Sequence, residues 1–110
     1  MRQCRQGDVF LQQVRIRERK GQEVLDQGRV ILAYGEVTGH AHEIIDAVTE
    51  EQLPPAQLFE EPDGTRYLFV DRACALVHQE HGPIALAPGV YQVIRQREYV
   101  ASDISRSVAD

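Results

Sequence analysis

The sequence predicts an all-β fold, a single small barrel or sandwich of about seven short strands with at most one short helix. Short runs of β-branched and aromatic residues recur along the chain, and Gly, Pro and Asp turn signals separate them at regular spacing. The 110 residues, 43% of them apolar, are enough for one domain with its own core, spanning residues 1–110.

The first half of the chain carries three predicted strands. Residues 8–16 form the first, because Val9, Phe10, Leu11, Val14 and Ile16 follow a glycine. The charged residues 17–23, interrupted by Gly21, are expected to be a turn or an exposed hairpin tip. Strands are then predicted at residues 29–37, which are rich in β-branched and apolar side chains, and at residues 43–48.

The second half begins with a polar stretch, residues 49–57, that allows one helical turn before Pro54-Pro55 stops it. Residues 58–61 and 65–71 flank Pro62-Asp63-Gly64, which predicts a hairpin because Gly supplies a positive φ. Further strands are expected at residues 73–78, 84–86 and, after Pro88-Gly89, 90–100. The last residues predict one short helix or a frayed end.

Composition excludes several classes of protein. The net charge of −5 argues against a general nucleic-acid binder, which needs a basic surface to meet phosphates. The N-terminus lacks the apolar region of a signal peptide, and no apolar run reaches the length of a membrane-spanning helix, so we expect a soluble cytoplasmic protein. Cys4 and Cys74 are too few for a zinc ribbon; free thiols with an inert, buried Cys74 are expected, and a single disulfide is the alternative.

The histidines carry the strongest chemical signal. All four fall into two close pairs, His40/His42 in GHAHEI and His78/His81 in HQEHGP. Imidazole is the commonest protein ligand of transition metals and changes its charge near neutral pH. The pairs therefore indicate a metal site or a proton-handling site.

Spacing gives each pair a different geometry. His40 and His42 are two residues apart, so a strand would present both on one face, together with Glu36 and opposite Glu43. His78 and His81, followed by Gly82-Pro83, fit a strand end that turns into a loop, with Glu80 as a further carboxylate. If the fold brings the pairs together, they could hold a divalent metal, zinc or iron, with three ligands and an open position or with four in a closed structural site.

Other interpretations of the same residues stay open. The histidines could carry out acid–base chemistry without a metal, or could be ordinary loop and structural residues. Arg95, Arg97 and Tyr99 share one face of the last predicted strand with Tyr91 and Val93. That face could bind an anion or another subunit, although a solvated face of an edge strand explains it as well.

Two resemblances arise from these motifs. GHAHEI, followed by Gly82 and by Pro88-Gly89, resembles part of the cupin pattern, in which a glycine precedes His-x-His and a second glycine–proline motif ends in a histidine; here Gln92 stands in that last place. The resemblance implies a small β-barrel with a metal on His40 and His42. The segments GEVTGHAHEI, HGPIALAPGVY and RQREY also look like small uncharacterised bacterial or phage-type proteins, a resemblance that spans most of the chain and implies no activity.

The leading hypothesis is thus a compact all-β protein that holds a divalent metal through His40, His42 and one or both of His78 and His81. Such a metal could serve an enzyme acting on a small polar substrate or could tie two strand ends together. The alternative is a non-enzymatic interaction or assembly module, a homo-oligomer that pairs through an edge strand such as residues 90–100.

Overall fold

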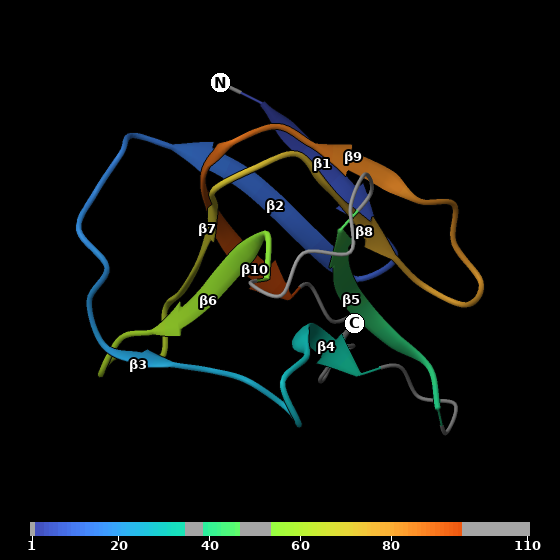
Figure 1. Cartoon of the computed structure of the whole chain (residues 1–110), viewed down its shortest axis with the longest axis horizontal. Coiled ribbons are helices and arrows are strands. Elements are labelled where there is room, and N and C mark those ends of the chain that lie inside the picture. Colours follow the sequence, from blue (N-terminus) through green and yellow to red (C-terminus); the bar gives the residue numbers. More distant parts are fainter. Residues whose placement is uncertain (1, 35–38, 47–53, 96–110) are drawn as a thin grey trace, which may run out of the picture.

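Ten β-strands in two antiparallel sheets make up the described part of the chain, residues 2–34, 39–46 and 54–95 of a computed structural model (Figure 1). The larger sheet has the order β1 (Gln3–Gln6), β2 (Val9–Val14), β10 (Gly89–Arg95), β7 (Arg66–Val70), β6 (Ala56–Glu60), β3 (Gln22–Glu23). The smaller sheet has the order β4 (Val30–Tyr34), β5 (Ala41–Asp46), β8 (Cys74–Val77), β9 (Ile84–Leu86). The all-β prediction is confirmed.

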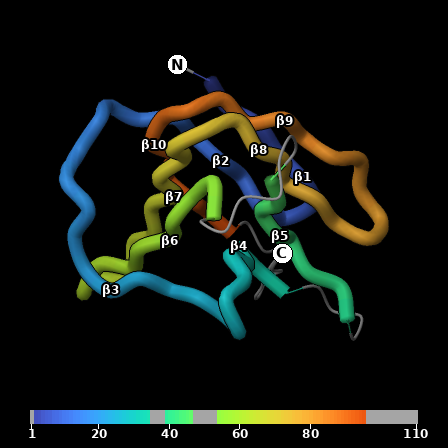
Figure 2. Tube along the Cα trace, viewed as in Figure 1, coloured from blue at the N-terminus to red at the C-terminus, as the bar shows by residue number. Residues whose placement is uncertain are grey.

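The core lies between the two sheets because alternate side chains of the strands point inward. In the larger sheet Val9, Leu11, Leu58 and Leu68 have no exposed surface. The facing residues of the smaller sheet are Val30, Ile44, Cys74, Leu76 and Leu86, all at most 5% exposed. In the tube view β6 and β7 lie on the left and β5 and β8 on the right (Figure 2).

Several predicted elements have the expected place. The hairpin around Pro62-Asp63-Gly64 joins β6 to β7, with the Gly64 N–H donating to the Glu61 carbonyl at 2.8 Å. The predicted strand at 84–86 is β9. The helical turn predicted ahead of Pro54-Pro55 lies outside the described residues, and the end of the same polar stretch, Ala56 and Gln57, belongs to β6. No helix, and so none that could cross a lipid bilayer, occurs within the three described ranges.

Two strands escaped prediction because their sequences are polar. β1 reads QCRQ and β3 reads QE, with no run of β-branched or aromatic residues to mark them as strands. Both lie at the ends of the larger sheet, where a strand has one neighbour and needs fewer buried side chains. β1 nevertheless contributes Gln6, which is 2% exposed and proves central to the site.

The expectation that the last strand is an edge strand is wrong. β10 pairs with β2 on one side and with β7 on the other, so its backbone groups are engaged within the sheet. Residues 90–93 are paired on both sides, so this part of the strand offers no free edge to a second copy of the chain. Arg97 and Tyr99 lie outside the described residues.

Candidate functional site

The fold brings the two histidine pairs together. The ring centroid of His42 lies 4.3 Å from that of His78 and 6.0 Å from that of His81. The rings of His78 and His81 are 4.7 Å apart, and His40 packs edge-on against His78 at 5.6 Å. We call these four side chains the histidine cluster.

Sheet register explains the convergence. β5 and β8 are antiparallel neighbours with Glu43 opposite Val77, so one step further along the register brings His42 opposite His78. His42 points inward and is 2% exposed, whereas Glu43 points outward and binds Arg29 at 3.0 Å, as the alternation of a strand requires. The predicted opposite faces of His42 and Glu43 are confirmed; Glu36 lies outside the described residues.

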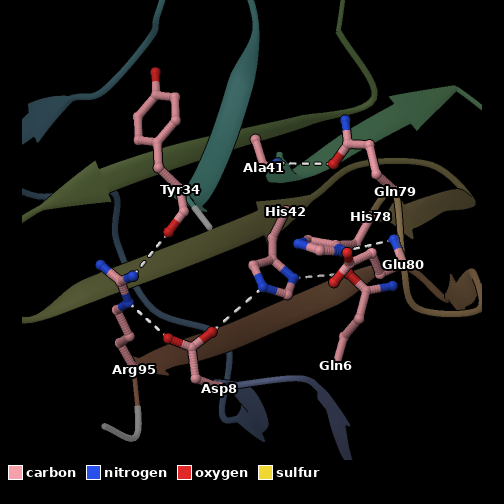
Figure 3. A network of polar contacts seen from close by, with 9 residues as sticks. All are labelled: Gln6, Asp8, Tyr34, Ala41, His42, His78, Gln79, Glu80 and Arg95. Carbon is pink, nitrogen blue, oxygen red and sulfur yellow. Dashed lines mark hydrogen bonds and ion pairs between the residues drawn. The ribbon is translucent and has the colours of Figure 1, made fainter. Parts of the chain in front are cut away.

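A buried glutamine fixes the orientation of the His42 ring (Figure 3). The Gln6 side-chain amide donates both its hydrogens to backbone carbonyls, those of Leu76 at 3.0 Å and Gly82 at 2.9 Å. The remaining Gln6 Oε1 can only accept, and it lies 2.9 Å from His42 Nδ1. His42 therefore carries a proton on Nδ1, and Nε2 is the nitrogen available for chemistry.

Nε2 of His42 faces a carboxylate from the larger sheet. Asp8, in the turn between β1 and β2, places Oδ1 3.3 Å from that nitrogen. Arg95 holds the other oxygen, Oδ2, at 2.8 Å and donates at 2.8 Å to the Tyr34 carbonyl (Figure 3). Asp8 is thus anchored by a guanidinium while one of its oxygens points at His42.

His78, His81 and His40 surround this contact at its solvent side. His78 Nδ1 accepts the backbone N–H of Glu80 at 3.0 Å, so its other nitrogen carries a proton when the ring is neutral. His81 is exposed. The Glu80 carboxylate, expected from the sequence as a further ligand, lies on the rim, 3.7 Å from His40 Nδ1, and the Glu80 side chain is 62% exposed.

The electrostatics favour the neutral imidazole at His42 and at His78 and the charged carboxylate at Asp8. Burial lowers the pKa of His42, and the neighbouring His78 lowers it further against the opposing pull of Asp8. Burial also lowers the pKa of His78, aided by His81 and His40. Burial alone would raise the pKa of Asp8, but the hydrogen bond and charge of Arg95 outweigh it and lower that pKa.

In this structure the side chains of the histidine cluster and Asp8 are not arranged around one point that a metal ion could occupy. Within the described ranges no three or more His, Cys, Asp or Glu side chains are arranged so that they could hold a metal ion. Neither cysteine belongs to the cluster: both are free thiols, Cys74 is buried as predicted, and burial raises its pKa to about 11, which disfavours the reactive thiolate.

Sequence reasoning missed Gln6, Asp8 and Arg95. Gln6 lies in a polar strand with no sign of burial, and Asp8 follows Gly7 in what reads as an ordinary turn. Arg95 was noted only as one member of a basic strand face. Gln6 and Asp8 reach His42 through the packing of one sheet on the other, and Arg95 acts on it through Asp8, so a single sequence gives no signal of these contacts.

Comparison with known proteins places the chain in a family. A family model described as a domain of unknown function, DUF8820, matches residues 5–96. The match spans every described strand from β2 to β10 and all four histidines. No curated protein matches the chain, and no solved structure matches it. The comparisons thus lend nothing to the resemblance to cupins, and the chain belongs to the DUF8820 family of unknown function.

Proposed function

We propose that the histidine cluster binds a divalent transition metal, zinc or iron, through His42, His78 and His81, with Asp8 as the fourth ligand. The convergence of the two histidine pairs carries this proposal. A tetrahedral zinc with bonds of ~2.0–2.1 Å to three imidazoles would hold their ring centroids about 5 Å apart. The three centroid separations of 4.3, 4.7 and 6.0 Å bracket that value.

The contact between His42 and Asp8 needs a cation. Burial lowers the pKa of His42 and so favours the neutral ring with its proton on Nδ1, and in that form the lone pair of Nε2 faces the negatively charged Oδ1 of Asp8 at 3.3 Å. Two acceptors at that distance repel unless a proton or a metal ion lies between them. The same distance is about that between two ligand atoms on one tetrahedral zinc.

The surroundings of His42 are typical of a metal ligand. A ligating histidine usually donates its second ring N–H to an acceptor that fixes the tautomer and the ring orientation. Gln6 Oε1 supplies that acceptor, and Leu76 and Gly82 in turn hold the glutamine. Arg95 holds Asp8 in a comparable way.

Binding requires small movements on the solvent side. His78 must release the Glu80 N–H from Nδ1 to free a lone pair for the metal, and His81 must turn its exposed ring inward. His40 stays at the rim beside Glu80 in this proposal. Four protein ligands make a closed, structural site, whereas a set of three without Asp8 leaves a position for a water or a substrate.

Metal binding is tested on untagged protein stripped with a chelator and then loaded with Zn²⁺ or, without oxygen, Fe²⁺. We expect one ion per chain by elemental analysis, and a stabilisation of about 2.7 kcal/mol at a metal concentration a hundredfold above Kd. His81→Ala, at an exposed position that should not disturb folding, and His42→Ala should both weaken binding strongly.

His40→Ala is the matched control, and it should bind the metal as the unchanged protein does. A wild-type chain that takes up neither ion, or His81→Ala and His42→Ala variants that bind as tightly as wild type, would contradict the metal site. In that case a proton occupies the space between His42 and Asp8, and the cluster is a buried imidazolium–carboxylate pair.

A further inference from the structure

A second feature of the fold is a pocket between the two sheets that is separate from the histidine ligands. It has a volume of about 430 Å³ and lies between β4 on one side and β7 and β10 on the other. Pockets that take small molecules occupy roughly 300–1,000 Å³. Apolar side chains, among them Val24, Ile31 and Val93, form much of its wall.

Two arginines and one aspartate supply the charge. Arg66 from β7 and Arg95 from β10 both line the pocket, as does Asp26. Arg66 uses Nε on Glu60 at 2.8 Å and Nη1 on the Leu32 carbonyl at 3.5 Å. Arg95 uses Nε on Asp8 and Nη2 on the Tyr34 carbonyl.

These contacts hold both guanidinium planes in place, and on each arginine they leave one nitrogen free to donate to a ligand. Within the described residues, Nη2 of Arg66 and Nη1 of Arg95 have no hydrogen-bond partner. Each arginine therefore offers a carboxylate one nitrogen, and a guanidinium that is already held in place loses little conformational freedom when it forms such a charge-assisted hydrogen bond. An apolar wall beside such donors fits a ligand that has an apolar body and one negative end.

We propose that this pocket binds a small organic carboxylate, with the negative end at Arg66 and Arg95 and the apolar body against Val24, Ile31 and Val93. The simpler role of the two arginines is to tie the sheets together, since each reaches from the larger sheet to a carbonyl of β4. That role predicts no affinity for carboxylates, so the two are distinguishable. The proposal does not depend on the metal.

Benzoate is the probe, and benzyl alcohol is its neutral counterpart of similar shape. Both are titrated into the full chain in the presence of a chelator, so that failure of the metal site leaves the result unaffected. We expect saturable binding of benzoate, with amide and methyl NMR shifts that centre on Val24, Ile31 and Val93. Benzyl alcohol should bind about tenfold or more weakly, because it lacks the charge-assisted hydrogen bonds.

Arg66→Gln is the test variant, since Arg95 also touches Asp8 and would confuse the two sites. It should weaken benzoate binding about tenfold or more. Arg17→Gln removes an arginine that pairs with Glu61 at 2.7 Å and lies over the Tyr67 ring, outside the pocket, and it should leave binding unchanged. If Arg66→Gln fails to fold, the affinities of wild type for benzoate and for benzyl alcohol still show whether the pocket prefers a carboxylate.

Three results would overturn the proposal. The first is an absence of saturable benzoate binding to wild type, and the second is an equal response to benzoate and to benzyl alcohol. The third is benzoate shifts that centre on the histidine cluster and not on the pocket.

Discussion

At the scale of single residues, Gln6 links His42 to two backbone carbonyls of the smaller sheet and the loop that follows β8. It is 2% exposed, and its side chain donates to two backbone carbonyls and accepts from the buried imidazole of His42. Those partners belong to β5, to β8 and to the loop after β8. One side chain of the larger sheet therefore fixes the position of the cluster in the smaller sheet.

Gln6→Leu tests this role. The change keeps the volume but leaves the Leu76 and Gly82 carbonyls and the His42 N–H unpaired, so unfolding should become easier by at least about 2 kcal/mol. Urea denaturation measures the loss. Gln92→Leu, at a half-buried position of β10, is the control and should change stability by less than about 1 kcal/mol. Equal effects of the two substitutions would show that Gln6 is not a structural anchor.

At the scale of elements, the β1–β2 turn delivers Asp8 to the cluster. Gly7 has φ +60° while Asp8 has no positive φ, the pattern of a two-residue hairpin turn with glycine first. A Cβ at position 7 would lie 2.8 Å from His81 Nε2 and 3.2 Å from His42 Cε1. The turn and the histidines are therefore packed so closely that a Cβ at position 7 would make the His81 ring shift.

Gly7→Ala should separate backbone strain from crowding of the cluster when it is compared with Gly28→Ala. Both positions have positive φ, but a Cβ at Gly28 meets nothing within 4 Å. Each variant should lose about 1–2 kcal/mol of stability from the left-handed backbone. Only Gly7→Ala should shift the imidazole NMR signals of His81 and His42 and weaken metal binding. Unchanged imidazole signals in Gly7→Ala would mean that the turn does not contact the cluster in solution.

At the scale of the whole molecule, the sequence predicted the type of fold and the chemistry-bearing residues better than their assembly. Apolar alternation and Pro-Asp-Gly identify β6, β7 and β9 because those signals are local. Polar strands such as β1 carry no local signal, and the central place of β10 depends on pairing with distant strands. The meeting of His42 with His78 follows from the β5–β8 register, and its meeting with Asp8 follows from the packing of one sheet on the other.

The cluster should make the stability of the metal-free protein depend on pH. In the unfolded chain the histidines take up protons near their ordinary pKa of about 6.5. In the folded protein burial and mutual repulsion lower the pKa of His42 and His78, so the folded state binds fewer protons below that pH. The contribution of the two neutral histidines to the free energy of unfolding is fully present above about pH 6.5. It is lost as the pH falls from there toward their lowered pKa values in the folded state.

Urea denaturation at pH 7.5, 6.5 and 5.5 in a chelator should therefore show a falling free energy of unfolding. Asp8 acts in a different pH range. Its lowered pKa stabilises the folded state above about pH 4, and this contribution is lost only below that pH, where the carboxyl of the unfolded chain becomes protonated. His78→Asn should flatten the loss between pH 7.5 and 5.5, since it removes one of the two groups and relieves the repulsion on His42. A wild-type stability that stays level or rises over that range would mean that the imidazolium–Asp8 attraction outweighs burial, and a proton would then hold the place that we assign to the metal.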